Sequence, residues 1–400
     1  MQAVQERQRC DWQLLMITVL LLILGTAVVL SSSWVLGTES FGNDGFYFFK
    51  RQVQWAGLAL VALTLTLRFP YWHFRDWKLW GVGLAAAFAL LVAVLVIGKE
   101  VNGSKRWISV GPIGFQPSEF AKVMMVVFLA RYSELWRGRI QHLTKGFLPP
   151  VITVLGLGAL VAKEDLGTAI VLIGTGLLMI VMMGARKRHV AGLIAFAVLA
   201  GCVLIAVEPY RQERISAWIK VVSNPVAAYQ DAAYQPSQGL IALGSGGLKG
   251  NGVMLGTAKH LYLPEAHTDY ILSTVGEETG FLGCVALLLL FAWLLIRGLT
   301  IAHRTRDWFG SLIAAGMTSM IALQAMLNVA VVTSIFPCTG VPLPFISYGG
   351  TSLLFTAVAI GMVLNVSQYP GGPPAMAREK RRRESRADGW RNRRAHLSRS

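Results

Sequence analysis

Long apolar runs, separated by short polar segments, dominate the pattern of the chain. A helix needs about 20 mostly apolar residues to cross a bilayer. Runs two, four and five below are short or polar, so the pattern allows nine to eleven spans. It predicts an all-α polytopic membrane protein with about ten transmembrane helices. The ten apolar runs are 13–36, 53–68, 79–98, 118–135, 147–163, 166–184, 189–207, 280–297, 310–335 and 345–366.

Basic residues in the segments between the runs indicate the orientation of the chain. If the N-terminus lies in the cytoplasm and every run crosses once, the inner segments before the tail carry 15 Lys and Arg residues. The short outer loops carry six. Cytoplasmic loops of membrane proteins are enriched in Lys and Arg. We therefore expect ten spans with both termini in the cytoplasm.

The two ends of the chain differ from the rest. The first apolar run follows Arg7 and Arg9, as in a signal peptide, but it is too long and lacks a clear small-residue cleavage site. We interpret it as a retained first helix. We expect one membrane domain over residues 1–370. The basic tail over 371–400 is expected to be cytoplasmic, disordered and close to anionic lipid headgroups.

One connecting segment is far longer than a connector needs. Residues 208–279 separate the seventh and eighth runs, and the predicted topology places them outside the cytoplasm. Loops of this length are usually functional or disordered. This one contains aromatic and aliphatic residues, which favours partial order. We expect a large extracytoplasmic loop with short amphipathic helices at the membrane interface.

Composition excludes several other classes of protein. Hydrophobic residues make up 54% of the chain and charged residues 14%, against about 25% charged residues in a soluble domain. The net charge of +16 suggests nucleic acid, but ten of the 37 Lys and Arg lie between Arg378 and Arg399. We expect no nucleic-acid partner. The four cysteines are far apart and form no CxxC motif, so we interpret them as packed or free thiols rather than a disulfide framework or zinc site.

Two charged residues stand at the start of the fourth run. Glu119 and Lys122 follow Pro117, which suits the first turn of a helix, and their i, i+3 spacing places them on one helix face. Charges that enter a membrane span are costly unless they are paired or line a wet cavity. The pattern leaves two interpretations open: a structural ion pair near the interface, or a cavity wall that binds a polar substrate group.

Acidic residues in two further segments are candidates for chemistry. Asp165 lies between the fifth and sixth runs, where it suits either a helix cap or a functional site. Glu265 and Asp269 lie near the end of the long outer loop and would share a face if that stretch is helical. A carboxylate at the membrane mouth is suited to act as a general base. The alternative is a solvated loop acid.

Two other stretches are unusual in composition. Residues 244–252 are rich in glycine and include Lys249. They lack the Gly-Lys-Ser/Thr of a P-loop, which leaves a phosphate cradle or a plain flexible turn. The stretch from Ile335 to Ile346 contains three prolines and no charge. Broken helices at membrane depth are tolerated where they are buried or line a cavity, so we expect this stretch to fold back into the bilayer.

Several of these segments together resemble the SEDS family, the shape, elongation, division and sporulation proteins. The strongest motif is GVPLPFISYGGTS, from Gly340 to Ser352. The similarity extends over nearly the whole chain. One departure is Glu164, where the family usually has Pro before the Asp, and another is Cys338. The other matching motifs are LPEAHTD at 263–269, GEETG at 276–280, RWI at 106–108, QPSEFAK at 116–122 and DLGT at 165–168.

The resemblance implies a glycosyltransferase that polymerises lipid II on the outer face of the bacterial inner membrane. It implies inversion at the donor carbon, with Asp269 as the essential carboxylate and general base. Family members also depend on the residues that match Glu119, Lys122 and Asp165. The implied partners are a class B penicillin-binding transpeptidase and other membrane proteins of the division or elongation machinery.

The leaving pyrophosphate in such a reaction requires positive charge. A divalent cation, Mg²⁺ or Mn²⁺, is a further candidate for that role, and no metal ligand can be assigned. Ser347, in the strongest motif, is a candidate substrate-binding residue. The basic candidates for the pyrophosphate are Arg51, Lys105, Arg106, Lys122 and Lys249.

Two rival functions remain open. A lipid II flippase would carry intramembrane charges equally well, but it does not need a single loop base. A non-catalytic scaffold for the transpeptidase would tolerate Asp269→Asn but not changes at the partner surface. The segment from Phe48 to Gln52 is closer to the division type and that from Gly250 to Thr257 to the elongation type. We slightly favour a role in division.

Overall fold

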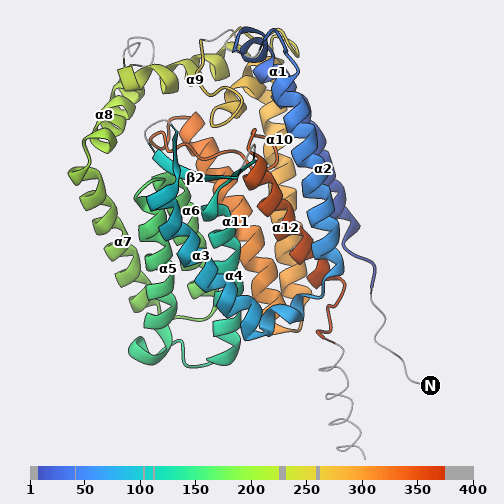
Figure 1. Cartoon of the computed structure of the whole chain (residues 1–400), viewed down its shortest axis with the longest axis vertical. Coiled ribbons are helices and arrows are strands. Elements are labelled where there is room, and N and C mark those ends of the chain that lie inside the picture. The colour runs from blue at the N-terminus through green and yellow to red at the C-terminus, as the bar shows by residue number, and fades with distance from the viewer. Residues whose placement is uncertain are drawn as a thin grey trace, which may run out of the picture.

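Long helices that run side by side make up most of the molecule (Figure 1). The computed structural model describes residues 8–40, 42–101, 104–110, 113–224, 231–257 and 262–373, so most of the predicted tail lies outside the described residues. Ten of the helices match the ten predicted runs, which confirms the all-α polytopic fold. They are α1 Trp12–Ser40, α2 Tyr47–Arg68, α3 Trp77–Ile97, α4 Pro117–Leu135, α5 Leu148–Ala162, α6 Leu166–Met182, α7 Lys187–Val207, α10 Ile271–Arg304, α11 Trp308–Val332 and α12 Gly350–Ser367.

Hydropathy alone identifies fewer of these helices as spans. Within the described residues, seven helical segments are long and apolar enough to cross a membrane, and the shorter Leu166–Met182 is also apolar. The helices α2 and α4 carry charged residues near their ends. They belong to the bundle because they pack against other helices, which a hydropathy window does not measure.

The first and last helices of the bundle meet at one end. The backbone N–H of Gln8 donates to the carbonyl of Gln368 at 3.1 Å, and that of Asp11 donates to Ser367 Oγ at 3.0 Å. The start of α1 and the end of α12 therefore lie on the same side, as an even number of spans requires (Figure 1). We call this the terminal end of the bundle and the other the loop end.

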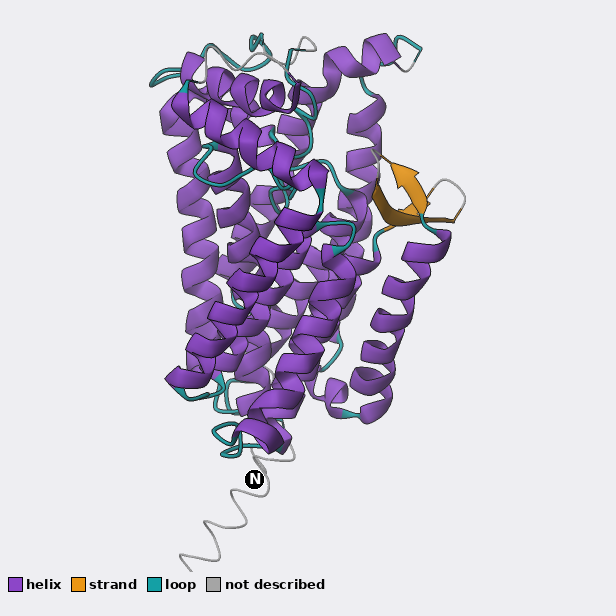
Figure 2. Ribbon diagram, turned by 90° about the vertical axis from the view of Figure 1, so that its left-hand side faces the viewer, coloured by secondary structure: helices purple, strands orange, loops and turns teal. Residues whose placement is uncertain are grey.

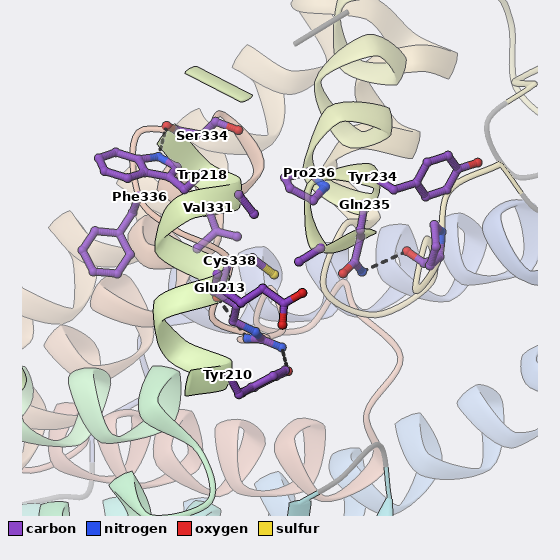
Figure 3. A pocket seen from close by; sticks show the side chains of 14 residues that line it. Tyr210, Glu213, Trp218, Tyr234, Gln235, Pro236, Val331, Ser334, Phe336 and Cys338 are labelled. Carbon is purple, nitrogen blue, oxygen red and sulfur yellow. Dashed lines mark hydrogen bonds between the residues drawn. The ribbon is translucent and has the colours of Figure 1, made fainter. Parts of the chain in front are cut away.

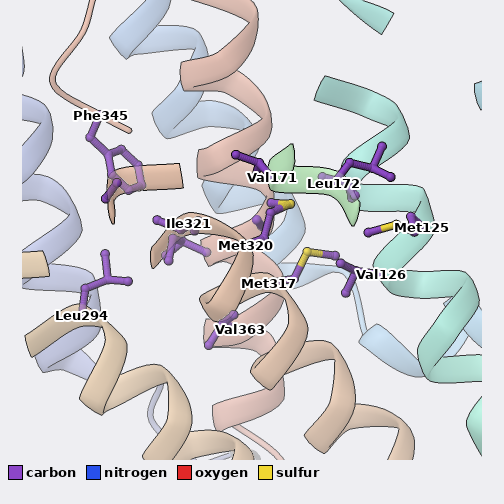
Figure 4. Close-up of a cluster of buried hydrophobic side chains, with 14 of the residues drawn as sticks. Met125, Val126, Val171, Leu172, Leu294, Met317, Met320, Ile321, Phe345 and Val363 are labelled. Carbon is purple, nitrogen blue, oxygen red and sulfur yellow. The ribbon is translucent and has the colours of Figure 1, made fainter. Parts of the chain in front are cut away.

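The core is built around α11, with α4, α6 and α12 packed against it. Figure 4 shows Met125, Leu172, Met317 and Val363, one from each of these helices, among the buried side chains between them. In contrast, Leu193 is the only buried residue of α7. Apolar side chains face lipid at no cost, because the hydrocarbon is as apolar as they are.

A small β-sheet, which the hydrophobic pattern did not predict, lies between α3 and α4 at the loop end (Figure 2). Its strands are β1 Lys99–Val101, β2 Ser104–Val110 and β3 Ile113–Phe115, all antiparallel in the order β1-β2-β3. The strands β1 and β3 have only three residues each, and β2, with the sequence SKRWISV, does not alternate between apolar and polar residues. The sheet matters because β2 carries Lys105 and Arg106.

The long segment after α7 contains α8 Pro209–Ser223, a 3₁₀ turn Asp231–Ala233 and α9 Tyr234–Ser245. The expectation of short helices in this segment is therefore confirmed for its described part. The predicted end of the loop at residue 279 lies at the break that divides α10, and the first part of α10, which begins at Ile271, falls within the predicted loop. Glu277 and Glu278 interrupt the apolar pattern there, yet both are buried. Their carboxylates accept hydrogen bonds from Thr257 and Ser31, and a helix break follows at Gly280, where φ is 68°.

Candidate active site

The segment between α11 and α12 folds into the bundle without forming a helix. Pro337, Pro342 and Pro344 lack the N–H that helix continuation requires. Phe345 in this segment is buried against α1, where a Cβ on Gly25 would lie 2.1 Å from the Phe345 carbonyl oxygen. The segment therefore packs as an interior loop that only a glycine in α1 admits.

Asp269 lies beside this interior loop. A Cβ on Gly340 would be 3.1 Å from Asp269 Oδ2 and 3.6 Å from Arg106 Nη1. Gly340 has a φ of +71°, a conformation that glycine adopts at little cost. The carboxylate of Asp269 and the guanidinium of Arg106 therefore converge on one glycine, although 163 residues of sequence separate them.

The backbone around Asp269 is a set of turns, and not the regular helix in which Glu265 and Asp269 would share a face. Glu265 has a φ of 54°, and the N–H of Tyr270 donates to its carbonyl at 3.3 Å. The Glu265 carboxylate accepts a hydrogen bond from the Thr268 hydroxyl at 2.7 Å. This turn holds two carboxyl groups near each other at the mouth of α10.

Arg106 connects Asp269 to the turn before α6. Its Nη1 lies 3.7 Å from Asp165 Oδ2, and its Nε donates to the Glu164 carbonyl at 2.9 Å. The Asp165 carboxylate also caps α6, because it accepts hydrogen bonds from the N–H and the hydroxyl of Thr168, both at 2.9 Å. Asp165 thus has the capping geometry that the sequence left open, and it faces Arg106 as well.

Glu164, the departure from the family pattern, ties the same turn to the sheet. Its carboxylate accepts a hydrogen bond from the backbone N–H of Lys105 at 2.7 Å. The turn that holds Asp165 is therefore formed without the usual proline. Lys105, Arg106, Glu164 and Asp165 also line a small pocket whose remaining walls are apolar residues of α3 and α5 and the start of α4.

The surroundings of Asp269 change its acidity. Burial raises the pKa of Asp269, the negative charge of Glu265 raises it further, and Arg106 lowers it. Asp165 also raises it and Arg214 lowers it, and the net result is a pKa of about 7. A carboxyl group with a pKa near neutrality is suited to exchange a proton with a reacting hydroxyl.

Two amides on α11, which the sequence analysis missed, join these parts. Asn328 Nδ2 donates to the carbonyls of Asp269 and Val341, both at 2.8 Å. One turn away, Gln324 Nε2 donates to the carbonyl of Pro342 at 3.0 Å. Polar residues in an otherwise apolar span are costly unless they are hydrogen-bonded, so the i, i+4 spacing of two amides was the available signal.

Glu119 and Lys122 form a closed ion pair in the interior. Lys122 Nζ lies 3.0 Å from Glu119 Oε1 and donates to Gln324 Oε1 at 2.7 Å, and both charged side chains are at most 4% exposed. The geometry is that of the structural ion pair, linked through Gln324 to the interior loop. Neither residue lines the pocket beside Arg106, and a direct contact of this pair with substrate stays a prediction.

The other predicted binding residues are Ser347, Arg51 and Lys249. The Ser347 hydroxyl already makes two hydrogen bonds to backbone groups. It donates to the Thr268 carbonyl at 2.6 Å and accepts from the N–H of Leu343 at 2.8 Å. Arg51 lies over the Tyr47 ring at 4.8 Å, in the first turn of α2. Lys249 is exposed in the turn after α9. Ser347 therefore fixes the loop that carries Asp269, and contacts of Arg51 and Lys249 with substrate stay predictions.

Replacing Asn328 with Leu tests whether this amide positions Asp269. The change leaves two carbonyl groups without their buried donor, at a cost of about 1–3 kcal/mol for each unsatisfied group. We expect a lower thermal midpoint and a loss of turnover of at least tenfold, measured on purified protein. Asn365→Leu is the matched control, because Asn365 also makes two hydrogen bonds to backbone groups, at the terminal end. Equal turnover of the two variants would contradict a positioning role.

Comparisons with known proteins agree with this architecture. The family model described as a cell cycle protein, FtsW/RodA/SpoVE, matches residues 12–371. The chain is 41% identical to stage V sporulation protein E of Bacillus subtilis over 90% of this chain and 97% of that protein. It is 36% identical to a probable peptidoglycan glycosyltransferase FtsW of Geobacter sp. strain M18, over 89% and 96% of the two chains.

Solved structures show the same fold. The rod shape determining protein RodA of Thermus thermophilus superposes with a TM-score of 0.66 at 26% identity, over 91% of this chain and 98% of that one. A chain from work on the structural coordination of polymerization and crosslinking by a peptidoglycan synthase complex gives 0.72 at 27% identity, over 90% and 98%. The extent of these matches shows that the chain belongs to the FtsW/RodA/SpoVE family of cell cycle proteins.

Proposed function

We propose that this membrane protein is a peptidoglycan glycosyltransferase that polymerises lipid II into β-1,4-linked glycan strands. The observation that carries the proposal is the Asp269 carboxyl group, with a pKa raised to about 7, beside the guanidinium of Arg106. The relatives named as probable peptidoglycan glycosyltransferases, at 35–37% identity over most of the chain, support it.

The reaction follows from this pair of groups. The Asp269 carboxylate takes the proton of the acceptor hydroxyl as the oxygen forms a bond to the donor sugar carbon. The bond from that carbon to the undecaprenyl pyrophosphate breaks on the opposite side, so the configuration inverts from α to β. Arg106 and Lys105 neutralise the charge that develops on the leaving pyrophosphate. The reaction is thus a single displacement with one base and one positively charged pocket.

A divalent cation fits this site only together with substrate. Within the described residues, no group of three or more His, Cys, Asp or Glu side chains is placed to hold a metal ion. Mg²⁺ is usually bound by one or two carboxylates together with substrate phosphates. Asp165 would supply such a carboxylate, which leaves Asp269 free to act as the base, and the cation would add positive charge at the pyrophosphate. The metal dependence of the reaction stays a proposal.

The position in the cell follows from the charge pattern. We infer that the chain lies in the bacterial inner membrane with both termini in the cytoplasm, so that Asp269 opens toward the outer face. A class B penicillin-binding transpeptidase is the proposed partner. The match to a chain of a peptidoglycan synthase complex that coordinates polymerization and crosslinking supports this partner. A role in division, and contacts with other proteins of that machinery, stay predictions.

Two rival functions make different predictions. A flippase moves lipid II between leaflets without joining sugars, and a scaffold needs neither step. The test is to purify the full chain with a candidate transpeptidase, supply fluorescent lipid II and separate the products on a gel. We expect a glycan ladder. A chain that yields no ladder but moves lipid II across liposome membranes would be a flippase.

The rate of polymerisation is expected to depend on pH through Asp269. Because the pKa of Asp269 is raised to about 7, the carboxylate form that acts as base becomes scarce below pH 7. We expect kcat/KM to fall by up to tenfold for each pH unit below that value and to be level above it. A rate that stays constant between pH 5 and pH 7 would contradict the assignment of the base.

Glu265→Gln sharpens this test, because the charge of Glu265 raises the pKa of Asp269. Removing that charge lowers the pKa, so the acid limb of the pH profile should move to lower pH while the rate above pH 8 stays close to the wild-type rate. Glu208→Gln is the matched control, since it removes the same charge from an exposed position at the start of α8. An unchanged acid limb in Glu265→Gln would argue that another group titrates.

A further inference from the structure

A second pocket, of about 260 Å³, opens between α8, the start of α9 and the interior loop (Figure 3). Tyr210, Glu213, Arg214 and Trp218 line it from α8, and Gln235 from α9. It shares no lining residue with the pocket beside Arg106. Its volume lies just below the roughly 300–1,000 Å³ of pockets for drug-sized molecules, which suits a single sugar unit.

Internal contacts hold the walls of this pocket in place. The indole N–H of Trp218 donates to the Ser334 carbonyl at 2.7 Å, and Gln235 Nε2 donates to the Pro264 carbonyl at 3.2 Å. Arg214 donates to the Cys338 carbonyl at 3.0 Å and to the Tyr210 hydroxyl. The aromatic rings and the guanidinium are therefore preorganised, which lowers the entropy cost of binding.

Glu213 is a charged residue in the lining whose carboxylate is available to bind a ligand. Figure 3 shows its carboxylate pointing from α8 toward Pro236 and Gln235 at the start of α9. Within the described residues, no hydrogen bond or ion pair holds this carboxylate. An ionised carboxylate accepts hydrogen bonds from hydroxyl and amide N–H groups, and it repels a phosphate. A neutral ligand rich in such donors is therefore favoured over the pyrophosphate.

The pocket extends to the candidate active site along two chain segments. Cys338 lines the pocket, and Gly340, two residues on, lies against Asp269. Pro264 also lines it and begins a run of turns that includes Asp269. A ligand in this pocket is thus bound close to the segment that carries the base. Lys105 and Arg106, whose charges suit a pyrophosphate, line the other pocket, whereas Arg214 in this one is held by the Cys338 carbonyl and the Tyr210 hydroxyl.

We infer that the pocket between α8 and α9 binds the terminal N-acetylglucosamine unit of the acceptor and presents its hydroxyl to Asp269. This inference rests on the proposed function, whose reaction requires an acceptor sugar. Aromatic ring faces carry negative charge density and attract the C–H groups of a sugar face, which assigns this role to Trp218. Glu213 accepts hydrogen bonds from the sugar hydroxyls or the acetamido N–H.

Binding of a neutral sugar tests the pocket without requiring turnover. The full-length chain in nanodiscs is mixed with N,N′-diacetylchitobiose, and saturation-transfer NMR follows the acetamido methyl signals. Losing a hydrogen bond to a charged group weakens binding by about tenfold or more, so Glu213→Gln should show that loss. Glu208→Gln, which removes the same charge at the start of α8 outside the pocket lining, should bind as the wild type does. No signal with the wild type, or an equal signal with Glu213→Gln, would overturn the inference.

The aromatic wall is tested by a pair of variants. Trp218→Leu should reduce the sugar signal about tenfold, and Trp218→Phe, which keeps a ring, should recover part of it. Both variants lose the hydrogen bond to Ser334, so a purely structural role would weaken them equally, and that result would overturn the assignment of Trp218.

Kinetics separate this inference from the proposed function. In the polymerisation assay, Glu213→Gln should raise the KM for lipid II about tenfold and leave kcat within about twofold. A chain that forms ladders with an unchanged KM in Glu213→Gln would reject the sugar pocket and keep the glycosyltransferase. A chain that forms no ladder, yet binds the sugar through Glu213, would reject the glycosyltransferase and keep the pocket.

Discussion

Replacing Asp269 with Asn is expected to lower the initial rate of glycan-strand formation by about 10²–10⁴-fold, the usual contribution of a positioned general base. The amide has nearly the shape of the carboxylate but cannot accept the proton of the acceptor hydroxyl. The hydrogen bond from Asn328 goes to the backbone carbonyl of residue 269, so the substitution leaves it in place. The measurement is the initial rate with purified protein and fluorescent lipid II.

Asp44→Asn is the matched control for this variant. Asp44 lies in the turn between α1 and α2, also at the loop end, where it pairs with Lys50 on the surface. The same chemical change there should leave the rate within about twofold of the wild type. If Asp269→Asn kept more than a tenth of the wild-type rate, another group would have to act as the base.

Lys122→Met is expected to cause the largest loss of stability. The change leaves the Glu119 carboxylate buried without its partner, and breaking a buried ion pair typically costs about 3–5 kcal/mol. Gln324 also loses the ammonium group that donates to its side-chain oxygen. We expect a clear fall in the thermal midpoint, measured by tryptophan fluorescence in detergent, and a yield of folded protein well below that of the wild type.

A double variant shows whether the stability lost in Lys122→Met comes from the unpaired charge of Glu119 or from the changed side-chain volume. Glu119→Gln combined with Lys122→Met removes both charges and should recover most of the stability, because an apolar or neutral replacement of a whole buried pair is often tolerated. Lys50→Met serves as the surface control, since its pair with Asp44 is largely exposed and surface pairs contribute little. A double variant as unstable as Lys122→Met would contradict the ion-pair account.

The bundle was predictable because its spans are governed by length and hydropathy. Each of the ten apolar runs became a helix, and the contact between Gln8 and Gln368 agrees with an even number of spans. The helical stretch of α10 before its break at Gly280 was not predictable in this way. Glu277 and Glu278 look like loop residues in a hydropathy window, whereas their partners Thr257 and Ser31 come from distant segments. Hydropathy contains no information on such partners.

The sequence predicted which residues belong to the candidate site but not which of them contact each other. Asp269, Arg106 and Asp165 were singled out through motifs, yet nothing in their spacing shows that Asp269 and Arg106 meet at Gly340 or that Arg106 also faces Asp165. Their convergence depends on the small sheet and on the interior loop, which are set by tertiary packing. Sequence reasoning also missed the amides Gln324 and Asn328, because it searched α11 for apolar length and not for paired polar positions.

The most direct test of the account is the product made by the chain reconstituted in liposomes with fluorescent lipid II and a candidate transpeptidase. The account predicts a ladder of glycan strands that a muramidase specific for β-1,4 linkages digests, and no ladder when Asp269→Asn replaces the wild type. A wild-type chain that yields no such ladder, or an Asp269→Asn variant that yields the same one, would contradict the assignment of a lipid II polymerase with Asp269 as its base.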